Sequence, residues 1–171
     1  MAPCPPFEAP ADGDAGKQPG RLALITGAAS RIGCAVAHPY ACEDANVAIA
    51  VVAAQIKNAG ETAAAIGQLS RICVNISGNV TDAGFRDQAV LTTIHDLRGI
   101  DVNVDNPAAQ QHSNQANALP VDQWELTFKA DSHASFDLIR EVSRTFARAA
   151  ASPPTLRPAF REDGIFLADR P

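Results

Sequence analysis

From Arg21 onward, short apolar runs alternate along the chain with longer segments in which small and apolar residues recur at helical spacing. A short apolar run bounded by turn residues is typical of a buried strand, and a recurrence every three to four residues is typical of a helix. The apolar runs predict strands at about 22–26, 46–52, 71–76, 100–104 and 164–168. The segments between them predict helices at about 30–43, 58–69, 81–97 and 120–150, the third capped by Thr81.

This alternation predicts the fold class. Strands that alternate with helices form a mostly parallel sheet with helices on both faces, and right-handed crossovers give a doubly wound, Rossmann-like α/β domain. The chain ends at Pro171, directly after the fifth predicted strand, so we expect the domain, residues 21–171, to be C-terminally incomplete. Residues 1–20 hold five prolines and three glycines and are expected to form a flexible arm.

Charge and hydropathy exclude several classes of partner. The net charge is −5 and the 14 Lys and Arg are scattered, which argues against nucleic acid and against an anionic membrane surface. No apolar stretch is long enough to span a bilayer, and the N-terminus lacks the pattern of a signal peptide. We therefore expect a cytoplasmic protein.

The cysteines and histidines give no sign of a metal site. Cys4, Cys34, Cys42 and Cys73 form no C-x-x-C pair, and no combination with the four histidines has the spacing of zinc ligands. We expect the four cysteines to be reduced, small apolar residues rather than disulfide partners.

The connection after the first predicted strand carries a candidate binding motif, T-G-A-A-S-R-I-G at residues 26–33. Gly27 allows a sharp turn off the strand, and Gly33 allows the following helix to lie close to the sheet. The helix N-terminus then presents free N–H groups and a positive dipole end, which suit a pyrophosphate. A glycine pattern alone also fits a plain strand-to-helix turn, but the order strand, loop and helix favours nucleotide binding.

Residues 21–50 resemble the opening of the short-chain dehydrogenase/reductase family, whose loop reads TGxxxGxG. Three later segments resemble that family in order and spacing: 78–82 (its G-D-V-T-D), 101–110 (its D-V-L-V-N-N-A-A) and 124–131 (the start of its long fourth helix). The resemblance covers about residues 21–148. The proline-rich arm and the Gln-Gln-His at 110–112 are similar to an N-terminally extended bacterial branch of the family.

The resemblance implies an NAD(P)-dependent oxidoreductase that acts on an alcohol/carbonyl pair of a small-molecule substrate. Carried over by position, the pyrophosphate lies against Gly27, Ile32 and Gly33, and the adenine against Asn79 and Val80. Asn79 replaces the usual aspartate, and its amide oxygen can still accept from an adenine amino group. The implied cofactor-binding set is Thr26, Gly27, Ser30, Arg31, Ile32, Gly33, Asn79, Val80, Asn106 and Ala108.

Arg31 occupies the family's middle glycine position, and two interpretations are open. A TGxxxRxG variant of the family uses the basic residue near the NADP phosphate, so Arg31 could bond a 2′-phosphate. Alternatively, its side chain blocks the loop. The second strand ends V-V-A-A at 51–54, without the acid that holds a free ribose 2′-OH. The cofactor is thus NADP or NAD, with NADP favoured.

The family's catalytic residues are not found. They are a serine and a Y-x-x-x-K pair, in which the tyrosine moves a proton and the lysine lowers its pKa. The one tyrosine here, Tyr40, falls in the first predicted helix, and no Y-x-x-x-K occurs. The family's long-helix asparagine is Asp131. We therefore expect a truncated chain, inactive by itself, in which only Asp131 stands at a catalytic position.

An alternative function is a non-catalytic nucleotide-binding or subunit-interaction module. The family pairs subunits through two long helices, and only the first of them, at 121–150, is present. Its apolar face would be exposed in a monomer and would favour a homo-oligomer.

Overall fold

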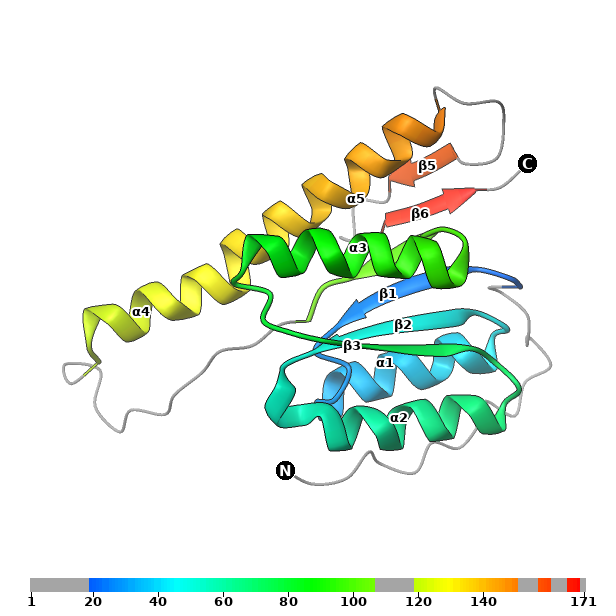
Figure 1. The fold of residues 1–171 in the computed structure, drawn as a ribbon, viewed down its shortest axis with the longest axis horizontal. Helices are drawn as coiled ribbons and strands as arrows, with labels where there is room; N and C mark the ends of the chain where they lie inside the picture. The colour runs from blue at the N-terminus through cyan, green and yellow to red at the C-terminus, as the bar shows by residue number, and fades with distance from the viewer. Residues whose placement is uncertain (1–18, 107–118, 151–156, 161–165, 170–171) are drawn as a thin grey trace.

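A single six-stranded sheet organises the molecule, in the order β3-β2-β1-β4-β6-β5 (Figure 1). The computed structural model describes residues 19–106, 119–150, 157–160 and 166–169, with side chains as far as residue 145. The strands are β1 (Leu22–Thr26), β2 (Asn46–Val51), β3 (Cys73–Ser77), β4 (Val102–Val104), β5 (Arg157–Phe160) and β6 (Phe166–Asp169).

The first four strands are parallel and confirm the prediction. β1 pairs with β2 on one side and with β4 on the other, and β2 pairs with β3. The first strand of the chain is therefore central, as the doubly wound arrangement requires. The predicted strand boundaries agree with the observed ones to within about two residues.

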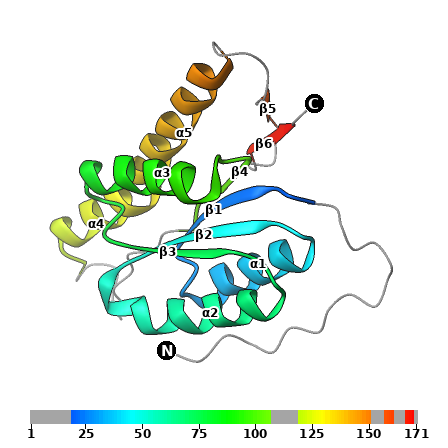
Figure 2. The same cartoon turned by 45° about the vertical axis from the view of Figure 1, so that its right-hand side comes forward.

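Helices cover both faces of this parallel sheet, and Figures 1 and 2 show α1 and α2 on one face and α3 with the long helix on the other. Their bounds are α1 (Arg31–Cys42), η1 (Ala53–Gln55, a 3-10 turn), α2 (Ile56–Gln68), α3 (Ala83–Leu97), α4 (Val121–Phe128), η3 (Lys129–His133, a π-helical turn) and α5 (Ala134–Ala150). The predicted helix at 120–150 is thus one rod with a π-helical turn inside it.

The alternation of side chains along the strands divides the core in two. In β1, Leu22 and Leu24 belong to the cluster under α3 and α5, whereas Ala23 and Ile25 belong to the cluster under α1 and α2. Successive strand residues point to opposite faces. Because both faces are covered, every residue of β1 is buried.

The cap of α3 differs from the prediction. Asp82, not Thr81, is the N-cap, and its Oδ1 accepts a hydrogen bond from the Gly84 N–H at 2.9 Å. The Thr81 N–H donates to Asn79 Oδ1 at 3.0 Å, so Thr81 belongs to the preceding turn. The acceptor of an aspartate suits the helix N-terminus as well as a threonine hydroxyl would.

The C-terminal strands also differ from the expected parallel arrangement. The predicted strand at 164–168 is β6, and it pairs antiparallel to β4. β5, which the sequence did not predict because of Pro158, pairs antiparallel to β6. Two strands joined by a short connection pair antiparallel, and a proline is tolerated in β5 because this strand lies at the sheet edge.

The described part of the chain bears on the expectations about membrane spans, metal sites and cysteines. No helix there is long and apolar enough to cross a membrane, and no group of three or more potential metal ligands gathers there. Cys42 and Cys73 are free thiols, as expected. Cys34 is disulfide-bonded, against the expectation of reduced cysteines. Most of the predicted arm at 1–20 lies outside the described residues.

Candidate nucleotide-binding site

A cavity of about 210 Å³ opens at the carboxyl ends of β1, β2 and β3. The strand order reverses between β1 and β4, and ligands of doubly wound folds bind at such a switch point. The cavity is lined by the β1 turn, the end of β2, the β3–α3 loop and the long helix. Its lining residues are Gly27, Ala50, Val51, Val52, Gln55, Gly78, Asn79, Val80, Thr81, Leu126 and Ala130.

The two glycines of the motif are required by close backbone contacts. Gly27 has φ +65°, and a Cβ atom there would lie 2.1 Å from the Asn106 carbonyl oxygen. A Cβ on Gly33 would lie 2.3 Å from the Gly27 carbonyl oxygen and 2.6 Å from the Ala28 Cα. Gly27 makes the sharp turn, as predicted, and Gly33 brings α1 against that turn rather than directly against the sheet.

Three polar side chains of the predicted set hold the turn from the protein side. Ser30 Oγ caps α1 by accepting from the Gly33 N–H at 3.1 Å, and it accepts from Asn106 Nδ2 at 3.1 Å. Thr26 Oγ1 accepts from the Asn106 N–H at 2.8 Å. These hydrogen bonds join the end of β1 to the end of β4. Thr26, Ser30 and Asn106 therefore shape the site rather than offering free groups to a ligand.

The first residues of α1 are open to solvent. Arg31 is exposed and Ile32 is 68% exposed. Arg31 is not among the residues that line the cavity, and within the described part of the chain it has no hydrogen-bond or ion-pair partner. Its side chain is thus available to an anion that lies at the helix N-terminus, where the first N–H groups lack intrahelical acceptors.

The β3–α3 loop forms the opposite wall of the cavity. Asn79 Oδ1 accepts from the Thr81 N–H, and the Asn79 carbonyl accepts from the Asp82 N–H at 2.9 Å. Gly78 lies so close to the Phe85 ring that a Cβ would come within 2.0 Å of it. Asn79 and Val80, predicted to contact adenine, line the cavity together with Gly27. The second lone pair of Asn79 Oδ1 stays available to a donor.

Two carboxylates lie between β4 and the long helix, where the family has asparagines. Thr26 Oγ1 donates to Asp105 Oδ1 at 2.8 Å, while Asp105 Oδ2 and Asp131 Oδ1 are buried without a hydrogen-bond partner in the described part of the chain. Burial raises the pKa of Asp105; the hydrogen bond from Thr26 lowers it, and the charge of Asp131 raises it further. Neither side chain, when ionised, supplies the N–H donors of an asparagine.

The tyrosine is unsuited to the family's chemistry. Tyr40 lies in α1, half-buried against the core cluster of that face. Burial raises the pKa of its hydroxyl, whereas a tyrosine that exchanges protons near neutral pH needs a lowered pKa. The structure therefore gives Tyr40 a packing role.

Part of the predicted set lies at the cavity, and Thr26, Ser30, Gly33 and Asn106 form the turn beside it. Gly27, Asn79 and Val80 line the cavity, and Ala108 lies outside the described residues. The sequence did not identify Gln55, Leu126 or Ala130 as lining residues. Their spacing carries no signal for this, because Gln55 enters through a 3-10 turn and the other two through the path of the long helix across the sheet.

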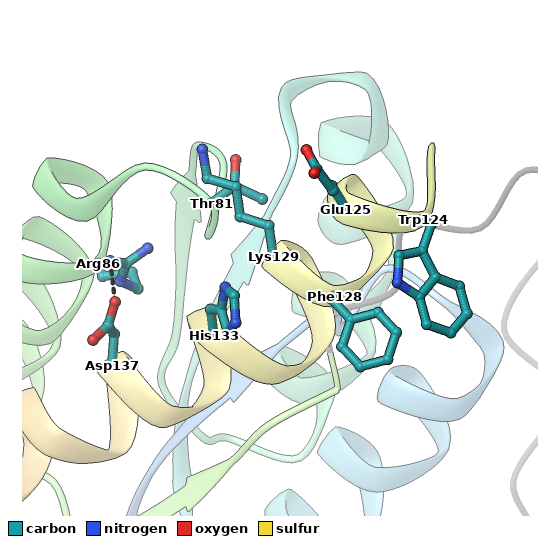
Figure 3. A pocket seen from close by; sticks show the side chains of 8 residues that line it. All are labelled: Thr81, Arg86, Trp124, Glu125, Phe128, Lys129, His133 and Asp137. Carbon is teal, nitrogen blue, oxygen red and sulfur yellow. Dashed lines mark hydrogen bonds and ion pairs between the residues drawn. The ribbon is translucent and has the colours of Figure 1, made fainter. Parts of the chain in front are cut away.

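A second and larger cavity of about 610 Å³ was also not predicted. It lies between α3 and the long helix and is lined by Thr81, Arg86, Trp124, Glu125, Phe128, Lys129, His133 and Asp137 (Figure 3). Thr81 borders both cavities. The Trp124 and Phe128 rings lie 4.5 Å apart and are largely exposed. This region thus combines an apolar surface with several charged groups.

Known proteins are similar to this chain in sequence. A family model described as short chain dehydrogenase matches residues 21–152. General stress protein 39 of Bacillus subtilis is 34% identical over 142 residues, which is 83% of this chain and 49% of that protein. Glucose and ribitol dehydrogenase homolog 2 of Arabidopsis thaliana is 32% identical over 82% of this chain and 50% of its own length. The chain spans about half the length of these curated relatives.

Solved structures show the same architecture. A dehydrogenase/reductase from Sinorhizobium meliloti is 30% identical with a TM-score of 0.69, over 74% of this chain and 49% of that chain. A short chain dehydrogenase from Burkholderia cenocepacia, solved in complex with NADP, is 25% identical with a TM-score of 0.70, over 74% of this chain and 51% of that chain.

Proposed function

The chain belongs to the short-chain dehydrogenase family, and from this premise we propose that it is the NAD(P)-binding part of an oxidoreductase that acts on an alcohol/carbonyl pair. The observation that carries the proposal is the turn between β1 and α1. A Cβ on Gly27 or Gly33 would strike backbone at 2.1 and 2.3 Å, so this turn is built for close approach. It borders a cavity at the switch point of the sheet, which suits a dinucleotide.

The residues around the cavity have separate roles in this proposal. The N–H groups at the start of α1 bind the pyrophosphate, with Gly27 and Gly33 allowing its approach and Ile32 covering it. Asn79 and Val80 contact the adenine. Thr26, Ser30 and Asn106 hold the turn in shape, and Ala108 lies near the ribose. Bound NAD(P) supplies hydride transfer; the chain binds and orients the cofactor.

NADP is the preferred cofactor in this proposal. Arg31 is exposed at the start of α1 and free of partners within the described residues, and a guanidinium forms strong paired hydrogen bonds to phosphate. No acid follows β2 in the V-V-A-A segment at 51–54. The exposure of Arg31, together with its position outside the cavity lining, favours the phosphate-binding interpretation over the loop-blocking one.

The 171-residue chain, taken alone, is proposed to bind cofactor without turnover. It contains no Y-x-x-x-K, and its one tyrosine is in α1 with a raised pKa. Asp131 stands at the family's helix-asparagine position but lies half-buried, and one of its oxygens has no hydrogen-bond partner among the described residues. It can hold a water molecule, but it cannot replace the tyrosine and lysine in proton transfer.

A titration of NADPH fluorescence tests the proposal. We expect the wild type to bind NADPH saturably and NADH more weakly. In Arg31→Ala the ratio of NADPH affinity to NADH affinity should fall by on the order of tenfold, because charged hydrogen bonds contribute roughly 1.5–3 kcal/mol. Lys57→Ala removes an exposed cation on α2 and serves as the control. No saturable binding would refute cofactor binding, and carbonyl-dependent NADPH oxidation above a heated control would refute the lack of turnover.

A second candidate function is a homo-oligomeric interaction module built on the long helix. It is favoured by the apolar residues exposed on α4, among them Val121 (70%), Trp124 (55%) and Phe128 (42%). Apolar side chains concentrated on one short helix mark an interaction surface. Sedimentation of the wild type against Trp124→Ser tests this. A concentration-dependent dimer that the substitution abolishes supports it, and a monomer at all concentrations refutes it. We retain cytoplasmic residence as part of the proposal.

A further inference from the structure

We propose that Arg86 is a positioning residue that fixes the adenine side of the cofactor cavity and ties it to the long helix. The inference rests on the proposed function, because it assigns the wall of the same cavity. The resemblance to the family assigned no role to Arg86. The inference comes from the contacts of Arg86, because arginine is almost never fully buried unless it is paired.

Arg86 lies in α3 and is only 8% exposed. Its Nη1 donates to the Val80 carbonyl oxygen at 2.7 Å, and its Nη2 pairs with Asp137 Oδ2 on α5 at 2.7 Å. One guanidinium thus reaches the β3–α3 loop and the long helix at the same time. Figure 3 shows Arg86 and Asp137 joined at one end of the second cavity, with the other lining residues on one side of the pair.

The first turns of α3 hold the loop at both ends. Phe85 lies directly against Gly78, where a Cβ would meet its ring at 2.0 Å. Its neighbour Arg86 holds Val80 by the carbonyl. Between these points the Asn79 turn closes on itself. Because Gly78, Asn79 and Val80 all line the cofactor cavity, the position of Arg86 sets the position of that wall.

The same guanidinium sets the distance to the opposite wall. Leu126 and Ala130 of the long helix line the same cavity as the loop residues, and Asp137 stands on the continuation of that helix. A bridge from Val80 to Asp137 therefore restrains the width of the cavity. The planar fork of arginine can serve a carbonyl and a carboxylate in fixed directions, which the single ammonium of lysine does less well.

Arg140 provides a matched control on the same carboxylate. Its Nη2 pairs with the other oxygen of Asp137, Oδ1, at 2.8 Å, but no contact with the loop is present among the described residues. If the ion pair with α5 were all that mattered, Arg86→Met and Arg140→Met would act alike. If Arg86 positions the loop, only its removal disturbs the cavity.

The experiment combines hydrogen exchange with a titration of AMP, which is the adenine half of NAD and differs from that of NADP only by the 2′-phosphate. In Arg86→Met we expect the Gly78 and Asp82 amides, which bond to Val51 and Asn79 carbonyls, to exchange faster than in wild type. Amides of β1 and β2 serve as the internal reference for global unfolding. AMP affinity should fall by about tenfold, in line with the loss of a charged hydrogen bond. Arg140→Met should leave the exchange rates of the loop amides and the AMP affinity within about twofold of the wild-type values.

Two conservative variants keep the test decisive if Arg86→Met does not fold. Arg86→Lys should give an intermediate loss of loop protection and AMP affinity. Asp137→Asn should loosen the loop although it lies on another element. Equal effects of Arg86→Met and Arg140→Met, or exchange that rises equally in loop and core, would overturn the inference. Absence of AMP binding in the wild type would instead refute the proposed function, while loop exchange would still decide the role of Arg86.

Discussion

The two sides of the switch point in this molecule contrast in how completely their polar groups are paired. At the β1–α1 turn, the Ser30 hydroxyl, the backbone of the turn and the Asn106 amide that reaches it from the end of β4 are joined by hydrogen bonds of 3.0–3.4 Å. On the side of β4 and the long helix, Asp105 and Asp131 each hold a buried oxygen with no partner in the described part of the chain. The first side binds phosphate in the family; the second carries its helix asparagine.

The difference shows that the two halves of the family's site meet different physical demands here. A phosphate-binding turn depends on backbone geometry, which glycines and a helix cap secure. The asparagine positions depend on a side chain that both donates and accepts, and an ionised aspartate only accepts. The chain has kept the geometry of the binding side and has exchanged the hydrogen-bond chemistry of the other side. Both statements can be tested by substitution.

The largest expected effect comes from filling the space at Gly33. Gly33→Val places atoms where even a Cβ would lie 2.3 Å from the Gly27 carbonyl oxygen. Because the obstacle is backbone, we expect the free energy of unfolding to fall by roughly 3 kcal/mol or more, together with loss of cofactor binding.

Gly60→Ala in α2 is the matched control for this substitution, since a Cβ at Gly60 meets nothing within 4 Å. It should be neutral or stabilising by up to about 1 kcal/mol, as expected for a glycine in a helix. Urea denaturation measures both variants. If Gly33→Val unfolds at the same urea concentration as Gly60→Ala, the turn is not the close-packed feature described above.

A middle-sized effect is expected from Ser30→Ala. This substitution removes the cap of α1 and one partner of Asn106 Nδ2, so the free energy of unfolding should fall by about 1–2 kcal/mol. Ser77→Ala, at an exposed position of β3, should change it by less than about 0.5 kcal/mol. Thermal unfolding measures both variants. Equal stability of Ser30→Ala and Ser77→Ala would contradict the role of Ser30 in holding the turn.

The smallest change in the free energy of unfolding is expected from Asp105→Asn, and here the substitution should stabilise the protein. Burial raises the pKa of Asp105, so the folded state binds more protons than the unfolded state from about pH 3.9 up to the raised value. Wild-type stability therefore falls as the pH rises through that window. The variant keeps the acceptor for Thr26 and removes the buried charge, so it should be the more stable protein at pH 7.

Denaturation curves between pH 7 and about pH 4.5 check this sign, because the advantage of the variant should shrink on acidification. Asp87→Asn, which removes an exposed carboxylate on α3, is the control and should give no such trend. A variant less stable than wild type at pH 7 would mean that the Asp105 carboxylate is satisfied by contacts that outweigh its burial.

The sequence by itself determined the local elements and the binding turn. Short apolar runs and the recurrence of apolar residues at helical spacing locate β1–β4 and the helices, because each element must bury one face or both. The positive φ of Gly27 and the contact of Gly33 with the turn are also local, since they follow from a strand that turns into a helix within a few residues. The contact that excludes a Cβ at Gly27 is made by Asn106, so tertiary structure supplies it. The family asparagine replaced by Asp131 could be recognised from its place in the predicted long helix.

Tertiary structure alone decided which distant groups meet. The bond from Arg86 to Asp137 spans 51 residues and that from Asn106 to Ser30 spans 76, and no spacing rule reaches so far along a chain. The antiparallel pairing of β6 with β4 and the pairing state of Asp105 likewise depend on neighbours supplied by other elements. Burial and hydrogen-bond partners arise from packing, so they are properties of the folded assembly of elements and not of any one segment.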